Sequence, residues 1–367
     1  MRSALALARR GLGRVWPNPA VGCVIVAPRK GGDGARALGR GWTQTGGRPH
    51  AETEALAQAG AGAKGATAYV TLEPCAHHGQ TPPCVDALVK AGVARVVVAV
   101  ADRDPRTAGT GIAALRAAKI DVTDNVLAAE ATELNAGFFM RLAQGRPLVT
   151  LKLATSLDGR IAMASGESQW ITGERSRARA HLMRAEHDAI LIGAGTAIAD
   201  DPLLTCRLPG MENRSPIPIV VDGGRRVPAG TKLFKMARER KTILATRAPD
   251  AAGKKSLAAL ADAGVEILEL RSDTPGHVDL AAMLRALGDK GLTRVMVEGG
   301  GGMGGALLRL GLVDRIAWFR APILLGGEGV PAVAGLELAK LADAPAFERT
   351  GLETLGDDLL ETYRRRA

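Results

Sequence analysis

The stretch YVTLEPCAHHGQTPPC, residues 69–84, decides the fold of the first half of this chain together with His50 and Glu52 upstream. Cys75 follows a strand-like run and a proline, and Cys84 follows two prolines at the start of a helical pattern. One imidazole and two thiolates form a three-ligand zinc set, which leaves a fourth position on the metal for water. Glu52 is then free to move protons.

The order His-x-Glu, Pro-Cys, Cys is the signature of zinc-dependent nucleobase deaminases, although the two cysteines there are separated by two residues. Here the eight residues from Ala76 to Pro83 separate them. His77 or His78 in this loop could instead supply a fourth ligand, so a structural-zinc binding module is one alternative. A polynucleotide base deaminase is the other.

The composition bounds the class of protein. A chain of 367 residues suggests two domains. The net charge of +10 falls mostly in the first half and fits an anionic ligand, but no block of five or six basic residues appears and aromatic residues make up only 3%. We therefore expect neither nucleic acid nor membrane partners. Four cysteines in a chain of this length indicate metal binding in a reducing cytoplasm rather than a disulfide framework.

The pattern of the first half predicts a layered α/β domain with a mostly parallel or mixed sheet. Gly145-Arg146-Pro147 is a helix stop followed by a linker, which places the domain boundary between 1–145 and 146–367. The second half restarts the alternation. Predicted helices are 3–11, 51–59, 84–91, 111–119, 128–143, 174–187, 281–287 and 306–310; predicted strands are 22–26, 66–72, 95–100, 120–126, 148–154, 189–192, 217–222, 241–245, 265–270, 294–297 and 315–325.

A glycine run after the strand at 294–297 indicates a phosphate site. Glu298 is followed by Gly299-Gly300-Gly301-Gly302-Met303-Gly304-Gly305, which lets backbone N–H groups approach a pyrophosphate. The run lies too late in its domain for a Rossmann fold, and no acidic residue follows at the required spacing. We expect dinucleotide phosphate binding without that fold, with a flexible loop as the alternative.

Several loops offer polar groups to ligands. Asn18, between two prolines, could present its amide to a base edge or simply form a turn. Residues 102–111 could line a pocket or be a plain loop. Residues 166–173 and 193–201, with Arg207 beyond, suit a ligand that carries phosphate. Cys23 and Cys206 are expected to pack in cores.

With these features in view, the chain closely resembles the bifunctional riboflavin-biosynthesis deaminase/reductase family nearly end to end. The matching stretches are PNPAVGCVIV (17–26), PHAE (49–52), YVTLEPCAHHGQTPPC (69–84), LKLATSLDGRIA (151–162), GESQWITG (166–173), DAILIGAGTAIADDPLLTCR (188–207) and VEGGGG (297–302).

The resemblance implies an N-terminal cytidine-deaminase-like α/β/α domain, followed by a dihydrofolate-reductase-like α/β domain. The first would deaminate 2,5-diamino-6-(5-phosphoribosylamino)pyrimidin-4-one with Zn²⁺, and the second would reduce the ribosyl group of the product to ribityl with NADPH. It also implies a cytoplasmic enzyme with small-molecule partners, and we expect a homo-oligomer, either a dimer or a tetramer.

The resemblance further assigns residues to roles. In the deaminase, His50, Cys75 and Cys84 would hold zinc and Glu52 would be the general acid/base, while Asn18 would contact substrate. In the reductase, the substrate contacts would be Ser168, Arg184, Leu204, Arg207 and Glu298. The NADPH contacts would be Ala154, Trp170, Thr196, Asp200, Gly300, Gly301, Gly302, Met303, Gly304, Gly305 and Ala306.

The chain departs from the family pattern at three places, none of which touches the zinc set. Gly223 follows Asp222 where the family commonly has serine. The segment 102–107 differs from the usual Asp-Pro-Asn-Pro-x-Val, and Val15-Trp16 replaces small polar residues.

Overall fold

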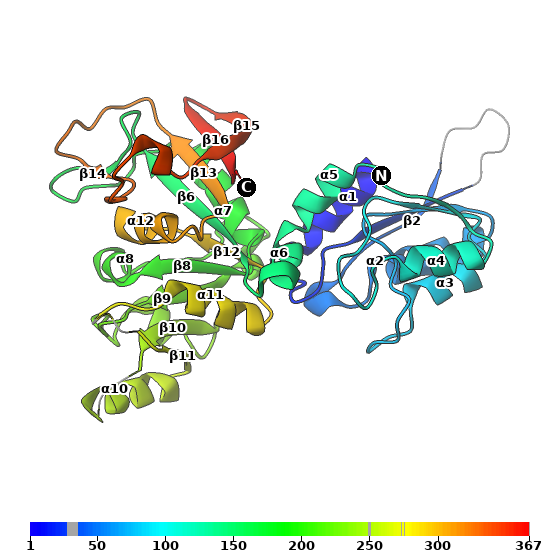
Figure 1. Ribbon diagram of the computed structural model, residues 1–367, viewed down its shortest axis with the longest axis horizontal. Coiled ribbons are helices and arrows are strands. Elements are labelled where there is room, and N and C mark those ends of the chain that lie inside the picture. The colour runs from blue at the N-terminus through cyan, green and yellow to red at the C-terminus, as the bar shows by residue number, and fades with distance from the viewer. Residues whose placement is uncertain (28–35, 249–250, 273, 275, 367) are drawn as a thin grey trace. The chain divides into compact units, whose positions relative to one another are not determined.

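The computed structural model describes residues 1–27, 36–248, 251–272, 274 and 276–366. The chain divides into two compact units, Met1–Gly145 and Arg146–Ala367. Each unit has its own sheet and its own core, and each is described by itself (Figure 1). Within the described part of the chain, no helix is long and apolar enough to cross a membrane.

The sheet of unit 1 is mixed, as the sequence predicted. Its strand order is β2-β1-β3-β4-β5. Strand β1 is antiparallel to both of its neighbours, whereas β3, β4 and β5 are parallel. The strands are β1 (Gly22–Val26), β2 (Ala37–Trp42), β3 (Thr67–Val70), β4 (Arg95–Val98) and β5 (Asp121–Thr123).

Helices cover both faces of this sheet, with α1 and α5 on one side and α2, α3 and α4 on the other (Figure 1). Glycines let the helices come close: a Cβ on Gly22 would lie 1.9 Å from the Ala4 carbonyl oxygen of α1, and one on Gly41 would lie 2.1 Å from the Ala51 oxygen of α2. The helices are α1 (Arg2–Ala8), α2 (Ala51–Ala59), α3 (Cys84–Lys90), α4 (Thr110–Ala117), α5 (Ala128–Leu134) and α6 (Ala136–Gln144), with 3-10 turns at Arg9–Gly11, Thr45–Gly47 and Gly60–Ala63.

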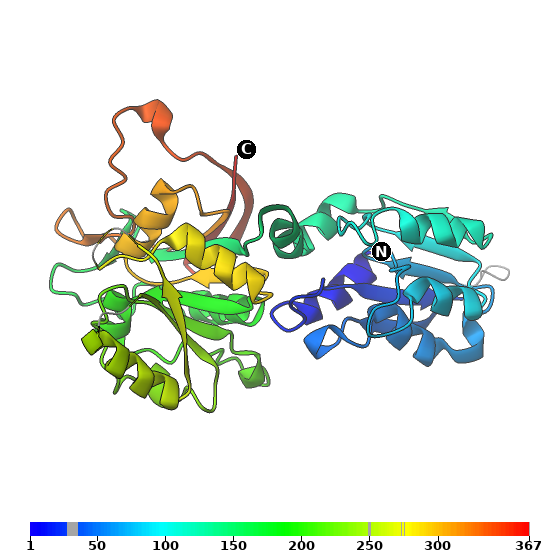
Figure 2. The same cartoon turned by 60° about the horizontal axis from the view of Figure 1, so that its bottom comes forward.

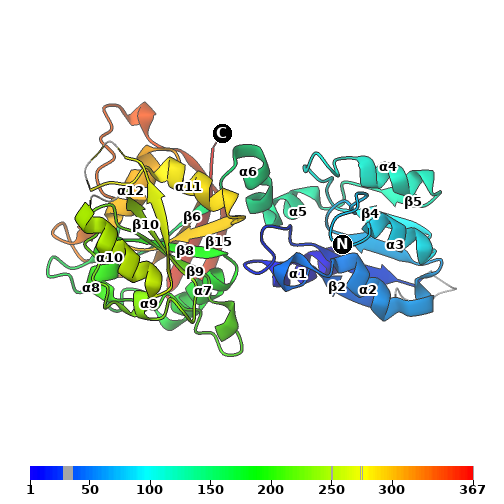
Figure 3. The ribbon, with the colours of Figure 1, turned by 90° about the horizontal axis from the view of Figure 1, so that it is seen from below.

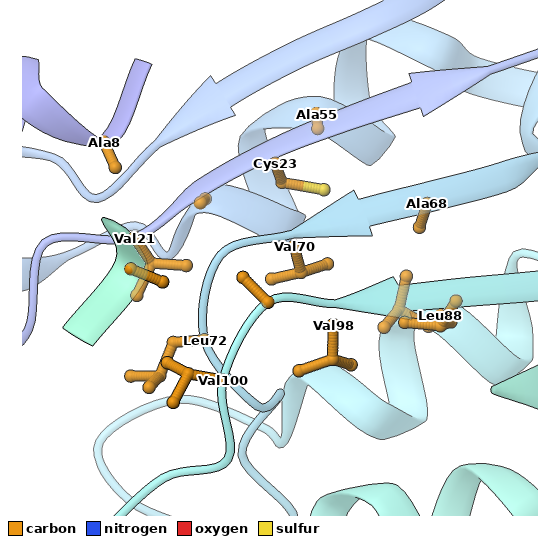
Figure 4. Packing of buried hydrophobic residues seen from close by; sticks show 14 of the residues in the cluster. Ala8, Val21, Cys23, Ala55, Ala68, Val70, Leu72, Leu88, Val98 and Val100 are labelled. Carbon is orange, nitrogen blue, oxygen red and sulfur yellow. The ribbon is translucent and has the colours of Figure 1, made fainter. Parts of the chain in front are cut away.

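The core of unit 1 is built from small and β-branched side chains. Cys23 lies in it beside Val70 and Val98, with Leu88 of α3 and Ala55 of α2 nearby (Figure 4). All five side chains are fully buried. The expectation that Cys23 has a packing role is therefore confirmed.

One expectation for unit 1 was wrong, and one strand was not predicted. The predicted helix at 128–143 is two helices, because Asn135 breaks the chain between α5 and α6 and turns its buried side chain onto the backbone of Ala20. Strand β2 was not predicted, since its glycines, which α2 requires, are poor strand formers.

The sheet of unit 2 has nine strands in the order β11-β10-β9-β8-β12-β6-β13-β16-β15. The strands from β11 to β13 in this order are parallel, and β16 and β15 are antiparallel. The strands are β6 (Leu148–Thr155), β8 (Ala189–Gly193), β9 (Ile217–Val221), β10 (Thr242–Arg247), β11 (Val265–Leu270), β12 (Arg294–Val297), β13 (Arg315–Arg320), β15 (Phe347–Leu355) and β16 (Asp358–Arg365).

Helices lie on both faces of this sheet as well, with α11 and α12 on one face and α7 and α9 on the other (Figure 3). The chain leaves β8 toward β9 and leaves β12 toward β13, so the strand order reverses between the neighbours β8 and β12. Parallel α/β sheets bind ligands at such a reversal. The helices are α7 (Glu174–Ala185), α8 (Ala194–Asp200), α9 (Lys232–Lys235), α10 (Ala251–Asp262), α11 (Leu280–Asp289) and α12 (Gly301–Arg309), with 3-10 turns at Glu212–Arg214 and Leu341–Asp343.

Three expectations for unit 2 need correction. Residues 193–201 were expected to form a loop, but 194–200 form the helix α8. The glycine run is mostly helix, because α12 begins at Gly301 rather than near Ala306. Strand β13 ends at Arg320 instead of continuing to 325. The hairpin of β15 and β16 was not predicted, and neither was the short pair of β7 (Arg160–Ala162) with β14 (Val330–Pro331). Strand β14 belongs to the long connection 321–346, which runs outside the large sheet (Figure 2).

Candidate active sites

The three predicted metal ligands lie together in unit 1. His50 Nδ1 is 3.2 Å from Cys84 Sγ and 3.7 Å from Cys75 Sγ, and all three ligand atoms lie within 4.8 Å of one another. One imidazole nitrogen and two sulfurs form a donor set that fits zinc. In the described residues the group contains no fourth protein ligand, so His77 and His78 do not close the site. A zinc ion held by these three residues would therefore keep a position for water, as catalytic zinc requires.

Two helix starts position these ligands. His50 is the residue before α2, and Cys84 is the first residue of α3. The Cys84 backbone N–H donates to Cys75 Sγ at 3.4 Å. Hydrogen bonding from Cys84 lowers the pKa of Cys75 to about 4, which favours the thiolate, the form that binds metals.

Glu52 lies in the first turn of α2 with only 3% of its surface exposed, and it lines the same cavity as His50 and Cys75. Burial raises the pKa of its carboxyl group to about 7. A cation on the neighbouring ligands would lower this value again. A buried carboxyl that lies beside the ligand set and lines the cavity is placed to exchange protons with a substrate.

The cavity has a volume of about 650 Å³. Its wall combines two of the predicted metal ligands with apolar, amide, arginine and carboxylate side chains, a mixed lining that suits a polar heterocycle. The lining residues are Pro17, Asn18, Pro19, Val21, Thr43, Gly46, Gly47, Arg48, His50, Glu52, Leu72, Glu73, Cys75, His77, Gly79, Gln80, Asp102, Asp104, Arg106, Thr107, Phe138, Arg141 and Leu142.

Asn18 is held in a fixed orientation at this cavity. Its Nδ2 donates to the Val15 carbonyl at 3.3 Å, and Gly47 approaches so closely that a Cβ there would lie 1.9 Å from that nitrogen. Gly47 has a φ of +87°, which only glycine adopts readily. Asn18 thus forms a turn and also faces the cavity, and its contact with substrate stays a prediction.

Glu73 is a functional residue that the sequence reasoning missed. Its buried carboxylate accepts the N–H groups of Asp102 at 3.1 Å, Gly109 at 3.0 Å and Ile112 at 3.0 Å. Glu73 therefore holds both ends of the loop 102–111. This loop lines the cavity, as the first of the two interpretations of the loop predicted. The sequence feature that could have indicated this role is the position of Glu73 directly before Pro74-Cys75.

In unit 2 the glycine run meets α8 at the reversal of strand order. The Gly300 N–H donates to Thr196 Oγ1 at 3.2 Å. Gly299 has a φ of +121°, and a Cβ on it would lie 2.6 Å from Thr196 Oγ1. Two of the segments predicted to bind NADPH, the glycine run and α8, are therefore adjacent. The first N–H groups of α12 lie next to this contact, and helix N-termini of this kind bind phosphate.

A buried ion pair joins two predicted substrate contacts. Arg184 donates to both carboxylate oxygens of Glu298, at 2.9 and 2.8 Å. Burial alone would raise the pKa of Glu298, but Arg184 and then Lys152 outweigh it, and the pKa falls to about 2. Burial lowers the pKa of Lys152, whose ammonium lies 5.7 Å from the Phe319 ring centre.

The remaining predicted contacts of unit 2 are more dispersed. Ser168 and Trp170 lie on an exposed loop, where Arg177 stacks on the Trp170 ring at 4.7 Å. In the described part of the chain neither forms a hydrogen bond with the glycine run. Ala154 is half-buried in β6, and Asp200 is exposed at the end of α8. Their ligand contacts stay predictions.

The departure at Gly223 has a structural reason. A Cβ at this position would lie 2.5 Å from the Gly276 carbonyl oxygen, so the backbone there excludes a side chain. Asp222 turns inward instead and accepts the Val227 N–H at 2.7 Å.

Comparison with protein families identifies both halves. The model of the cytidine and deoxycytidylate deaminase zinc-binding region matches residues 1–100, and that of the RibD C-terminal domain matches residues 147–360.

Curated relatives match nearly end to end. The chain is 44% identical over 372 residues to the riboflavin biosynthesis protein RibD of Escherichia coli K12, covering 98% of this chain and 96% of the relative. It is 40% identical to the RibD of Aquifex aeolicus, covering 100% of this chain and 97% of the relative.

Solved structures also match the chain over its whole length. Acinetobacter baumannii RibD, form 1, superposes with a TM-score of 0.86 at 37% identity, covering 100% of this chain and 98% of that one. A Thermotoga maritima diaminohydroxyphosphoribosylaminopyrimidine deaminase/5-amino-6-(5-phosphoribosylamino)uracil reductase gives 0.84 at 33% identity, covering 100% and 97%. These likenesses confirm the expected folds, a cytidine-deaminase-like unit followed by a dihydrofolate-reductase-like unit.

Proposed function

The chain belongs to the RibD family of bifunctional riboflavin-biosynthesis deaminase/reductases, and from this premise we propose how its two units divide the reactions. Residues 1–145 remove the 2-amino group of 2,5-diamino-6-(5-phosphoribosylamino)pyrimidin-4(3H)-one as ammonia. Residues 146–367 reduce the ribosyl group of the resulting 5-amino-6-(5-phosphoribosylamino)uracil to ribityl with NADPH. The observation that carries the proposal is the convergence of His50, Cys75 and Cys84 at a cavity that Glu52 also lines.

In the deaminase unit, His50, Cys75 and Cys84 would hold zinc, which makes water nucleophilic at neutral pH. The carboxylate of Glu52 takes a proton from the water that attacks the amidine-like carbon. It delivers this proton to the ring nitrogen and then passes the proton of the new hydroxyl to the departing amino nitrogen, so that water is consumed, ammonia leaves and the ring gains a carbonyl. Asn18 orients the base through its amide.

In the reductase unit, NADPH supplies the hydride. The N–H groups at the start of α12 and the Thr196 hydroxyl hold the cofactor phosphates, and Ala154, Trp170 and Asp200 complete the cofactor contacts. Arg184 and Glu298 keep each other in a fixed geometry beside Ser168, Leu204 and Arg207, which contact the phosphoribosyl group. The protein therefore mainly binds and orients the two reactants.

We place this enzyme in the cytoplasm, as a dimer or tetramer that acts on small molecules. Two free thiols in the ligand set support a reducing compartment, and the positive net charge supports a phosphorylated substrate. A polynucleotide base deaminase would leave the whole of unit 2 without a role.

The test measures bound metal, ammonia release and NADPH oxidation with the purified full chain. Zinc should be bound at one ion per chain, and the diaminopyrimidine should release ammonia without NADPH. The deaminated product should then oxidise NADPH. Ammonia release that survives complete removal of the metal would contradict the deaminase assignment, and a deaminated substrate that leaves NADPH unoxidised would contradict the reductase assignment.

A further inference from the structure

The segment 203–207 of unit 2 is held by side chains rather than by a helix or strand. It contains Leu204 and Arg207, two of the proposed substrate contacts. Three successive carbonyls of the segment accept hydrogen bonds from side chains outside it, and the Cys206 N–H donates to Ser215 Oγ at 3.0 Å. Because backbone groups that leave water need partners, these bonds decide the conformation of the segment.

Arg240 makes two of the three carbonyl contacts. Its Nη1 donates to the Leu203 carbonyl at 2.6 Å, and its Nη2 donates to the Leu204 carbonyl at 2.9 Å. The same Nη2 also donates to the Pro216 carbonyl, directly before β9. One planar guanidinium thus ties the segment to the beginning of a central strand, a geometry that a lysine ammonium does not reproduce.

Helix α7 holds the segment from its other side. Arg184 Nη1 donates to the Thr205 carbonyl at 2.9 Å while the rest of its guanidinium pairs with Glu298. His181, one turn earlier on α7, places its Nδ1 3.1 Å from the same carbonyl. The segment is therefore fixed between a proposed substrate-binding ion pair and Arg240.

Leu204 needs this support because its backbone is left-handed. It has a φ of +52° and is buried. Such a conformation is costly for a residue other than glycine and persists only where the surroundings impose it. The two carbonyl bonds from Arg240 flank this residue, so they act directly on the strained backbone.

Arg240 also adds positive charge without a compensating acid. In the residues the structure describes, no carboxylate pairs with it, and burial followed by the nearby Arg184 lowers its pKa to about 10. The guanidinium stays charged at neutral pH. Its two terminal nitrogens donate to carbonyls alone, and in the described residues its buried Nε has no hydrogen-bond partner. Cations that lack carboxylate partners favour an anion beside them.

We propose that Arg240 is a positioning residue of the reductase site: it presets the segment 203–207 so that Leu204 and Arg207 meet the phosphate-bearing end of the substrate. The inference rests on the reductase function proposed above and adds a residue to it. Because Arg240 acts through backbone carbonyls, its loss weakens substrate binding more than hydride transfer or cofactor binding.

The experiment compares Arg240→Met, Arg240→Lys and Arg238→Met in the full chain. Arg240→Met should raise the KM for 5-amino-6-(5-phosphoribosylamino)uracil by about 10-fold or more, with kcat and the KM for NADPH within about 3-fold of wild type. Arg240→Lys should restore part of the loss, because it keeps the charge and one donor. Arg238 is an exposed neighbour whose side chain, among the described residues, donates only to the Asp262 carbonyl at 2.9 Å, and its substitution should change nothing.

Ammonia release by unit 1 and the melting temperature of each variant serve as controls for folding. A folded Arg240→Met with an unchanged substrate KM would overturn the inference, and so would equal rises in both KM values, which indicate a general loss of structure. If Arg240→Met does not fold, Arg240→Lys decides, since an unchanged KM there overturns the inference too. A wild-type chain that fails to oxidise NADPH contradicts the proposed function itself.

Discussion

The side chain of Asn135 binds both backbone groups of Ala20, 115 residues earlier: its Oδ1 accepts the Ala20 N–H at 2.9 Å and its Nδ2 donates to the Ala20 carbonyl at 3.1 Å. Asn135 is 2% exposed. The bonded residue directly follows Pro19, so this contact fixes the turn that carries Asn18 at the zinc cavity. Helix α6, which starts after Asn135, lines the same cavity with Phe138 and Arg141.

Asn135→Leu keeps the branched outline of the side chain and removes both hydrogen bonds. Two buried backbone groups then lose their partners, at a cost of about 1–3 kcal/mol each. We expect ammonia release to fall by about 10-fold or more, a loss of about 1.4 kcal/mol or more in transition-state stabilisation, with NADPH oxidation of the deaminated substrate unchanged. The exposed Asn213→Leu is the control. Full ammonia release by Asn135→Leu would show that the turn holds without this contact.

Glu52→Gln should separate metal binding from catalysis. Glutamine has the same shape but cannot carry protons, and the metal ligands are other residues. We expect one zinc per chain, with ammonia release lowered by about 10²–10⁴-fold. Glu54→Gln, two residues along α2 and outside the cavity lining, should keep full activity. The proton-transfer role is wrong if Glu52→Gln releases ammonia at the wild-type rate.

Gly299→Ala should damage cofactor binding selectively. The backbone at Gly299 has a φ of +121°, and the new Cβ would lie 2.6 Å from Thr196 Oγ1. The loop must shift, which moves the N–H groups at the start of α12. We expect the KM for NADPH to rise by about 10-fold or more, by the conversion of about 1.4 kcal/mol per decade. Gly230→Ala meets no atom within 4 Å and should have no effect; an unaltered NADPH KM in Gly299→Ala would argue against phosphate binding here.

Local sequence patterns were enough to predict the zinc ligands and most of the parallel strands. The zinc ligands could be predicted because His50, Cys75 and Cys84 each lie next to a strand end or a helix start. Short stretches of sequence determine where these elements begin and end. The interior strands β6, β8, β9, β10 and β12 of unit 2 are mostly apolar runs, which buried parallel strands require.

Other features depend on contacts that no short stretch reveals. The hairpin of β15 and β16 is rich in charged residues, so it lacks the apolar signal of the interior strands. The sequence of the glycine run resembles that of a loop. In the fold most of it belongs to α12, which packs so closely that a Cβ on Gly301 would lie 2.7 Å from the Pro331 oxygen. Glu73, Asn135 and Arg240 all bind backbone groups at least 24 residues away. Because every residue type has these backbone groups, no sequence pattern marks the partner.

His187 should make unit 2 less stable in mild acid. It is 5% exposed, and its ring lies 2.7 Å from the Met183 carbonyl through Nδ1 and 3.0 Å from the Thr150 hydroxyl through Nε2. The carbonyl can only accept, so Nδ1 carries the proton and Nε2 accepts from the hydroxyl in the neutral ring. Burial lowers the pKa of this imidazole to about 4.

The unfolded chain, with a histidine pKa of about 6.5, binds a proton at a pH where the folded unit does not. Stability should therefore rise with pH between about 4 and 6.5, and acidification across this window should remove about 3 kcal/mol of the free energy of unfolding through this group. Denaturant titrations of the full chain from pH 4.5 to 7.5 measure the slope, which His187→Gln should reduce by up to about 1.4 kcal/mol per pH unit. His277→Gln is exposed and should keep the wild-type slope, whereas an equal slope in His187→Gln would mean that the buried imidazole is not the group that titrates.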